Sequence, residues 1–176
     1  MKGIEKVFIA CCLIIISCKN AIEEPLVVEE KSAPAEKLIV DFSFKTDQQD
    51  TFRIMMNNIE VDELQKKNIQ FSEEVAPSSS FENFHAEFDA NNMSNNVVIN
   101  LGNKSIKKVE IESIKITYGD NEIIASTPVQ LKEYFVLNKF VTLDSVGSTL
   151  STNRVDNQHF PAISLKRKSI NYLKKE

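Results

Sequence analysis

Side chains suited to binding a ligand are concentrated in two parts of the sequence. The six candidate ligand-binding residues are Tyr118, Asp120, Asn121, Arg154, Asp156 and His159. The first three lie in a predicted turn, and the last three share a polar loop. Their hydroxyl, carboxylate, amide, guanidinium and imidazole groups donate and accept hydrogen bonds, and a tyrosine adds an aromatic face. These groups predict a binding site for a polar ligand.

Motifs of the common catalytic sites are missing from the sequence. It contains no HExxH, GxSxG or Walker motif and no Gly-rich dinucleotide loop, and four glycines leave little material for cradling a phosphate. The two histidines, His85 and His159, lack the paired spacing of metal ligands. His85 is on the outward phase of a predicted strand. We therefore expect a protein that is not an enzyme, and a hydrolase is the least favoured function.

Oxygen ligands for calcium could come from two pairs of residues if their loops converge. These pairs are Asp47 with Asp50, and Asp120 with Asn121. Asp and Asn are also ordinary turn formers, which explains both pairs without a metal. A structural calcium is therefore not indicated, and no cofactor is expected.

All three cysteines lie in the first eighteen residues, at Cys11, Cys12 and Cys18. A disulfide framework, a CxxC zinc site and a cysteine nucleophile are thus excluded from the rest of the chain. The folded part must be stabilised by packing.

The N-terminus predicts a signal peptide over residues 1–17. Met1 to Lys6 carries two lysines, and Val7 to Ser17 is an almost uninterrupted apolar run of the length of a signal h-region. A membrane-spanning helix needs about 20 apolar residues, so this run is too short to be a permanent anchor.

The four residues Ile15-Ile16-Ser17-Cys18 resemble the lipobox of bacterial lipoproteins, although Ile16 is bulkier than the usual residue. The resemblance implies cleavage before Cys18 and acylation of its thiol and new amino terminus. Lys19 replaces the Asp of many inner-membrane members, which favours the outer membrane, on its periplasmic face or at the cell surface. The membrane is thus the first expected partner.

An acidic tether is predicted over residues 18–38. It contains Pro25, Pro34 and five glutamates but few apolar residues, so it cannot bury enough surface to fold. The folded domain is predicted over residues 39–176.

Charge does not favour a nucleic-acid partner. The 21 Lys and Arg residues and 25 Asp and Glu residues give a net charge of -4. Two short basic runs, Lys107-Lys108 and Lys166-Arg167-Lys168, are predicted to lie at solvated strand edges or sheet faces.

Apolar residues recur with period two through most of residues 39–176, which predicts antiparallel strands with one buried face. Residues 39–45 and 52–56 are expected to form a hairpin across Asp47 to Asp50. Further strands are expected at 84–88, 97–101, 109–118, 123–125, 139–143, 148–152 and 162–167, with turn residues at 91–96. Residues 57–67 fit either a turn of helix or a loop.

Two local devices interrupt this alternation. The inward phase shifts between Ile111 and Ile114, which predicts a β-bulge near Glu112 and Ser113. The segment Thr127-Pro128-Val129-Gln130 has a capping box and a proline at the first helical position, so one short helix is expected, with Leu131 and Phe135 inward and an end at Asn138.

The expected fold is an all-β, jelly-roll-like antiparallel sandwich with one short helix. The segments NNVVINLGNKSIKKVEIESIKI, YFVLNKFV and DNQHFPAISL resemble β-sandwich modules of bacterial surface proteins related to jelly-roll and galactose-binding-like carbohydrate-binding modules. That resemblance implies a non-catalytic, glycan-binding role. The chain has no Trp for stacking on a sugar, however, and a module that binds an envelope protein through an apolar face is the alternative.

Overall fold

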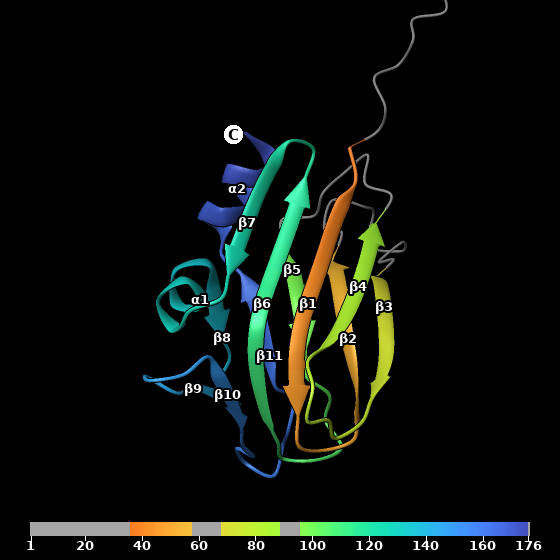
Figure 1. Ribbon diagram of the computed structural model, residues 1–176, viewed down its shortest axis with the longest axis vertical. Coiled ribbons are helices and arrows are strands. Elements are labelled where there is room, and N and C mark those ends of the chain that lie inside the picture. The colour runs from red at the N-terminus through yellow and green to blue at the C-terminus, as the bar shows by residue number, and fades with distance from the viewer. Residues whose placement is uncertain (1–35, 58–67, 89–95, 176) are drawn as a thin grey trace, which may run out of the picture. The chain divides into compact units, whose positions relative to one another are not determined.

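Strands with alternating burial make up most of the residues described by this computed structural model, which are 36–57, 68–88 and 96–175. The strands form two facing antiparallel sheets, and two short helices lie beside them (Figure 1). The fold is therefore the antiparallel β-sandwich that the sequence predicted. The predicted signal peptide, Cys18 and the predicted tether up to residue 35 lie outside the described residues.

Each sheet has a continuous path of five strands. Sheet A has the order β4 (Glu82–Phe88), β1 (Leu38–Thr46), β6 (Lys108–Tyr118), β10 (Thr149–Thr152) and β9 (Val141–Leu143), and β7 (Asn121–Ala125) also pairs with β6. Sheet B has the order β3 (Asn68–Val75), β2 (Asp50–Asn57), β5 (Val97–Asn100), β11 (Ala162–Leu165) and β8 (Phe135–Leu137). All described strand pairs are antiparallel.

The core lies between the two sheets and is rich in phenylalanine. The rings of Phe42 and Phe44 on β1 stack with centroids 4.6 Å apart, and Phe52 on β2 lies 5.0 Å from Phe44 across the core. All three side chains are fully buried. Burial of such a side chain stabilises a fold by about 1.5–3 kcal/mol, so packing accounts for the stability of a domain without cysteine.

The predicted hairpin between the first two strands is wrong. Strand β1 pairs with β4 and β6 in sheet A, whereas β2 pairs with β3 and β5 in sheet B. The connection around Asp47 therefore crosses from one layer to the other. Period-two alternation shows which face of a strand is buried, and two strands that bury the same kind of face can lie opposite each other as well as side by side.

The predicted bulge in the long strand is confirmed. Ser43 of β1 pairs with Ser113 of β6, but the next residue, Phe44, pairs with Ile111, so Glu112 is the extra residue. The bulge restores the inward phase, because Ile111 and Ile114 are both buried.

The predicted helix is confirmed as α1 (Pro128–Tyr134), with the capping box between Thr127 and Gln130. It ends earlier than predicted, because residues from Phe135 to Leu137 form β8 and pair with β11. This pairing takes over the hydrogen bonding of the backbone at the point where the helix stops.

A second helix, α2 (Arg167–Lys174), corrects two predictions, namely a single helix and a strand edge or sheet face at Lys166-Arg167-Lys168. Lys107 of the other basic run is buried, so its predicted solvated position is wrong as well. Strand β11 ends at Leu165 instead. Ser169, Ile170 and Leu173 are buried, and this spacing is that of one helix face. The two helices lie beside the β7 and β8 side of the sandwich (Figure 1).

The remaining strand predictions hold approximately, with β3 and β8 as unpredicted additions. Most of the ambiguous 57–67 stretch and of the predicted turn at 91–96 lies outside the described residues. Neither described helix is long and apolar enough to cross a membrane.

Candidate functional site

The six candidate residues from the sequence lie in two groups at opposite ends of the sandwich. Tyr118, Asp120 and Asn121 are at the β6–β7 turn, whereas Arg154, Asp156 and His159 are in the connection from β10 to β11. Strand β10 pairs with the beginning of β6, since Ser151 lies opposite Lys108. Lys108 and Tyr118 are the two ends of an 11-residue strand, so the two groups lie near opposite ends of a strand that is about 34 Å long at ~3.4 Å per residue. They therefore cannot form one site.

The first group makes contacts within the domain. The Asn121 side-chain amide donates a hydrogen bond to the Leu173 carbonyl at 2.9 Å, and Asp120 lies 3.9 Å from Lys175. Burial raises the pKa of Tyr118 above its ordinary value, and the nearby Glu36 carboxylate, which accepts a hydrogen bond from the phenol, raises it further. These contacts join the β6–β7 turn to α2 and to the start of β1.

His159, in the second group, is buried and bonded through both ring nitrogens. Nδ1 lies 3.2 Å from the Asn103 carbonyl, and a carbonyl only accepts, so Nδ1 carries a proton. Nε2 lies 3.1 Å from the Thr152 hydroxyl, which in turn accepts the Lys107 backbone N–H at 2.9 Å. His159 thus helps to hold the 101–107 loop against β10.

Arg154 and Asp156, by contrast, are exposed on a tight turn. Asp156 and Asn157 have φ angles of 52° and 59°, as a type I′ turn requires, and Val155 and Gln158 form a bridge across it. Asp156 also lies 3.6 Å from Lys139.

A fully buried ion pair, which the sequence analysis did not predict, lies next to this loop. Lys107 Nζ is 2.6 Å from Asp50 Oδ2, and both side chains are inaccessible to solvent. Asp50 also accepts backbone N–H groups from Thr51 at 2.8 Å, Lys104 at 3.0 Å and Ser105 at 3.2 Å. The ammonium, by contrast, has no well-aligned hydrogen-bond acceptor among the described residues.

The backbone of the loop is shaped around this carboxylate. Gly102 has a φ of +77°, and a Cβ atom there would overlap the Asp50 carboxyl carbon. Burial alone would raise the pKa of Asp50, but the Lys107 ammonium and the backbone N–H groups outweigh it and lower the pKa below the ordinary value. Asp50 is therefore the fixed anion around which the 101–107 loop closes.

Metal binding gains no support from this geometry. Asp50, one of the residues considered for calcium, has its carboxylate occupied by Lys107 and the loop N–H groups. Within residues 36–57, 68–88 and 96–175, no group of three or more His, Cys, Asp or Glu is placed to hold a metal ion.

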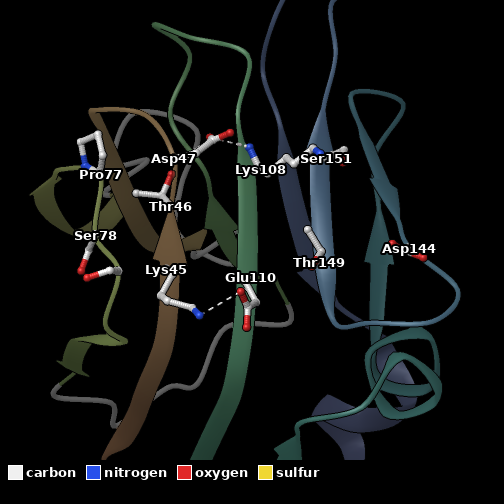
Figure 2. Close-up of a pocket in the computed structure, with 11 residues that line it drawn as sticks. Lys45, Thr46, Asp47, Pro77, Ser78, Lys108, Glu110, Asp144, Thr149 and Ser151 are labelled. Carbon is white, nitrogen blue, oxygen red and sulfur yellow. Dashed lines mark hydrogen bonds and ion pairs between the residues drawn. The ribbon is translucent and has the colours of Figure 1, made fainter.

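A groove lies on the outer face of sheet A (Figure 2). It has a volume of about 710 Å³, which is in the range of about 300–1,000 Å³ for ligand sites. Its lining residues come from β1, β6, β10 and three connecting segments: Lys45, Thr46, Asp47, Pro77, Ser78, Ser79, Lys108, Glu110, Asp144, Thr149 and Ser151. We call this surface the sheet A groove.

Both signs of charge line the sheet A groove. Lys45 Nζ lies 3.0 Å from Glu110 and 4.3 Å from the centroid of the Phe81 ring. The Lys108 backbone N–H donates to Asp47 at 2.8 Å, and the Lys108 side chain extends toward Ser151 in Figure 2. The groove therefore offers ammonium, carboxylate and hydroxyl groups on a rigid sheet.

None of the six predicted residues lines this groove. The sequence did contain a signal, because Lys45, Lys108 and Glu110 occupy the outward, polar positions of alternating strands. These outward positions indicate a binding surface only once the strand pairings of β1, β6 and β10 are known, because those pairings place the residues side by side.

A smaller cleft of about 370 Å³ lies between β7, α1 and α2. Exposed Ile124 and Tyr172 line it together with Tyr134, and a Lys168–Glu133 ion pair of 3.6 Å links the two helices there. This cleft is the more apolar of the two surfaces in its exposed side chains.

The chain matches no protein-family model, and no curated protein shows significant sequence similarity to it. Its function must therefore be inferred from its own residues.

Proposed function

We propose that this protein is a lipid-anchored, non-catalytic protein of the bacterial cell envelope whose sandwich binds a glycan in the sheet A groove. The observation that carries the proposal is the groove itself, a concave polar surface built from three strands of one sheet. The backbone of paired strands is held in fixed positions, so ligand binding does not have to order the backbone of the site.

The chemistry of the groove suits a polyhydroxylated ligand. A sugar hydroxyl both donates and accepts hydrogen bonds, and the groove supplies carboxylate acceptors at Glu110 and Asp144 and an ammonium donor at Lys108. Phe81 is 39% exposed beside Lys45 and adds apolar surface for the C–H face of a sugar ring.

The anchor in this proposal is the acylated Cys18 at the end of the lipobox. Two or three acyl chains give stable attachment, since each buried methylene contributes about 0.8 kcal/mol and one chain alone is marginal. Lys19 favours the outer membrane. Cys18→Ser should remove the acyl mass from the purified chain and release the protein from membranes, and a wild-type chain without acyl mass would refute the anchor.

A glycan array probed with the purified chain tests the binding site. The Lys108→Ala, Glu110→Ala double variant should lose about tenfold or more in affinity, because a hydrogen bond to a charged group contributes about 1.5–3 kcal/mol. The matched control is Lys115→Ala, Glu122→Ala, which removes an ion pair of 2.6 Å from the same outer face outside the groove. Equal losses in the two variants would contradict the groove as the site.

A second candidate function is that of an assembly protein that binds an envelope protein. The observation in its favour is the cleft between β7, α1 and α2, where Ile124 is 44% exposed and Tyr172 is 58% exposed. Two results together would establish this function instead. The chain would bind no glycan on the array, and the wild type would recover one specific envelope protein that the Ile124→Asp variant does not recover.

A further inference from the structure

The exposed face of α2 is strongly basic, although the chain as a whole is acidic. Residues 166–175 include five cations and no acid, against a net charge of -4 for the whole chain: Lys166, Arg167, Lys168, Lys174 and Lys175. Ser169, Ile170 and Leu173 are buried against the sandwich, which directs the opposite face of the helix to solvent. The helix is thus amphipathic, with its apolar face already used for packing.

The exposed residues of this helix include a group on one side. Lys168 and Tyr172 are four positions apart, so they lie on one side of the helix with Arg167 next to them, and exposed Lys175 is the residue that caps the C-terminus of the helix. An aromatic ring between cations is the arrangement found at membrane surfaces, where the ring lies at the level of the headgroups and the cations meet phosphates.

The carboxylates that pair with these lysines bind them only weakly. Lys168 lies 3.6 Å from Glu133 and Lys175 lies 3.9 Å from Asp120, and all four side chains are extensively exposed. Exposed ion pairs at such distances contribute about 0–1 kcal/mol each. Both lysines can therefore exchange these carboxylates for another anion at little cost.

The basic helix lies at the end of the sandwich where the predicted tether joins it. Leu38, the first residue of β1, pairs with Tyr118, and Tyr118 pairs with Asn121 across the β6–β7 turn. The Asn121 side chain then hydrogen-bonds the Leu173 carbonyl in the last turn of α2. Figure 1 shows the end of α2, the β6–β7 turn and the start of β1 together at one end of the domain. A lipid at Cys18 would restrain this end of the domain closest to the membrane.

We propose that the exposed residues of α2 and its C-cap, Arg167, Lys168, Tyr172 and Lys175, bind the anionic phospholipid surface of the membrane that carries the acyl anchor. This inference rests on the lipid anchor of the proposed function, but not on glycan binding. Clusters of four or more Lys and Arg on an amphipathic helix bind anionic lipids, and residues 166–175 contain five, three of them in the proposed contact. The tether makes this binding intramolecular, so a weak contact is sufficient. Binding through this end leaves the sheet A groove, which lies toward the opposite end, accessible from outside the membrane.

A single tryptophan can report this contact, because the chain has no Trp. The acylated chain with Tyr172→Trp is reconstituted in vesicles of phosphatidylcholine alone or with phosphatidylglycerol, and quenching by brominated lipid is measured. The fluorescence of this tryptophan should shift to the blue and be quenched on the anionic vesicles, and both effects should fall at high salt. The matched probe is Phe81→Trp, at a position that precedes β4 at the far end of the sandwich, and its fluorescence should stay unquenched.

Charge variants separate specific binding from general attraction. Arg167→Gln, Lys168→Gln and Lys175→Gln together should lower the ratio of contacting to free domains about a hundredfold, since each cation contributes about 1 kcal/mol, which is a factor of about five. The control is Lys104→Gln, Lys115→Gln and Lys139→Gln, which makes the same change in net charge on three other exposed lysines and should leave the quenching unchanged.

The outcomes are distinct for the two proposals. If the Tyr172→Trp chain floats with vesicles but its tryptophan is unquenched on anionic lipid, or is quenched no more than that of the Phe81→Trp chain, the α2 contact is overturned and the anchor stands. A chain that floats with neither kind of vesicle would overturn both. Quenching that persists in the triple α2 variant would show that the cations do not hold the helix at the surface.

Discussion

Removing either partner of the buried ion pair between Asp50 and Lys107 should destabilise the domain, but the two changes should differ in size. Lys107→Met removes an ammonium without a well-aligned acceptor, and Asp50 keeps the N–H groups of Thr51, Lys104 and Ser105. We expect a loss of about 3 kcal/mol, at the lower end of the range of about 3–5 kcal/mol for breaking a buried pair. The midpoint of thermal unfolding should fall by about 10 °C, at about 3 °C per kcal/mol for a domain of this size.

Asp50→Ala should be the more damaging change. It leaves the Lys107 ammonium buried without a counter-charge and also removes the acceptor of three backbone N–H groups. The expected loss in unfolding free energy is about 5 kcal/mol or more. Domains are stable by only about 5–15 kcal/mol, so this loss could unfold a domain at the lower end of that range. The Asp50→Asn, Lys107→Met double variant keeps an acceptor and removes both charges, so it should be more stable than Asp50→Ala.

The same pair predicts a dependence of stability on pH. Because the pKa of Asp50 is lowered in the folded state, its stabilisation is fully present above the ordinary aspartate pKa of about 3.9. It is lost as the pH falls through the lower folded value. The gap in unfolding free energy between wild type and Lys107→Met should therefore narrow below about pH 4.

Urea unfolding followed by far-UV circular dichroism measures these differences at each pH. Lys45→Met is the control, since Lys45 belongs to a partly exposed pair with Glu110 and should cost less than about 1 kcal/mol. If Asp50→Ala were as stable as Lys107→Met, or if the gap stayed constant down to about pH 2, the role of Asp50 as the fixed anion of the loop would be refuted.

Three further changes can be tested together. Gly102→Ala should cost more than about 3 kcal/mol in urea unfolding, because its φ of +77° disfavours a side chain and the Cβ overlaps Asp50, and a loss below about 1 kcal/mol would contradict this placement. Thr127→Ala should cost about 1 kcal/mol in the same assay by removing the cap of α1, whereas a neutral effect would argue against the capping box. Glu36→Gln should lower the pKa of Tyr118 in a titration of phenolate absorbance, yet leave it above the ordinary value because burial, the larger cause, remains.

Local sequence patterns were sufficient for most of the individual strands, though not for β3 and β8. Alternation in β1 and β6 showed which side chains are buried, and the phase shift around Glu112 located the bulge. The capping box between Thr127 and Gln130 located the start of α1 for the same reason, because all its contacts lie within four residues. Each of these features depends on neighbours in the chain.

Features that depend on distant partners were missed. The layer to which β2 belongs is decided by its pairing with β3 and β5, which alternation does not encode. Asp50 looked like a turn residue and Lys107 like a surface cation, because charges remain buried only when a distant partner compensates them. α2 has only eight residues and a basic sequence, so its short buried face was not recognised.

The candidate site was missed for the same reason. Lys45, Lys108 and Thr149 belong to three strands, and no spacing in the sequence indicates that β10 follows β6 in the sheet. Local composition predicted binding residues at the β6–β7 turn and in the β10–β11 connection. Such composition identifies loops, but it does not show how far apart two loops lie.

The crossing from β1 to β2 also has a kinetic consequence. Strand β1 is completed only when β4 and β6 arrive from later in the chain, and β5 obtains its second neighbour only from β11 near the C-terminal end. A partly synthesised chain can form few of these strand pairs, so it gains little stability. The complete chain has to close long loops before the contacts form, so folding should take milliseconds to seconds rather than microseconds. A chain emerging from the ribosome would therefore remain unfolded until β11 has been made.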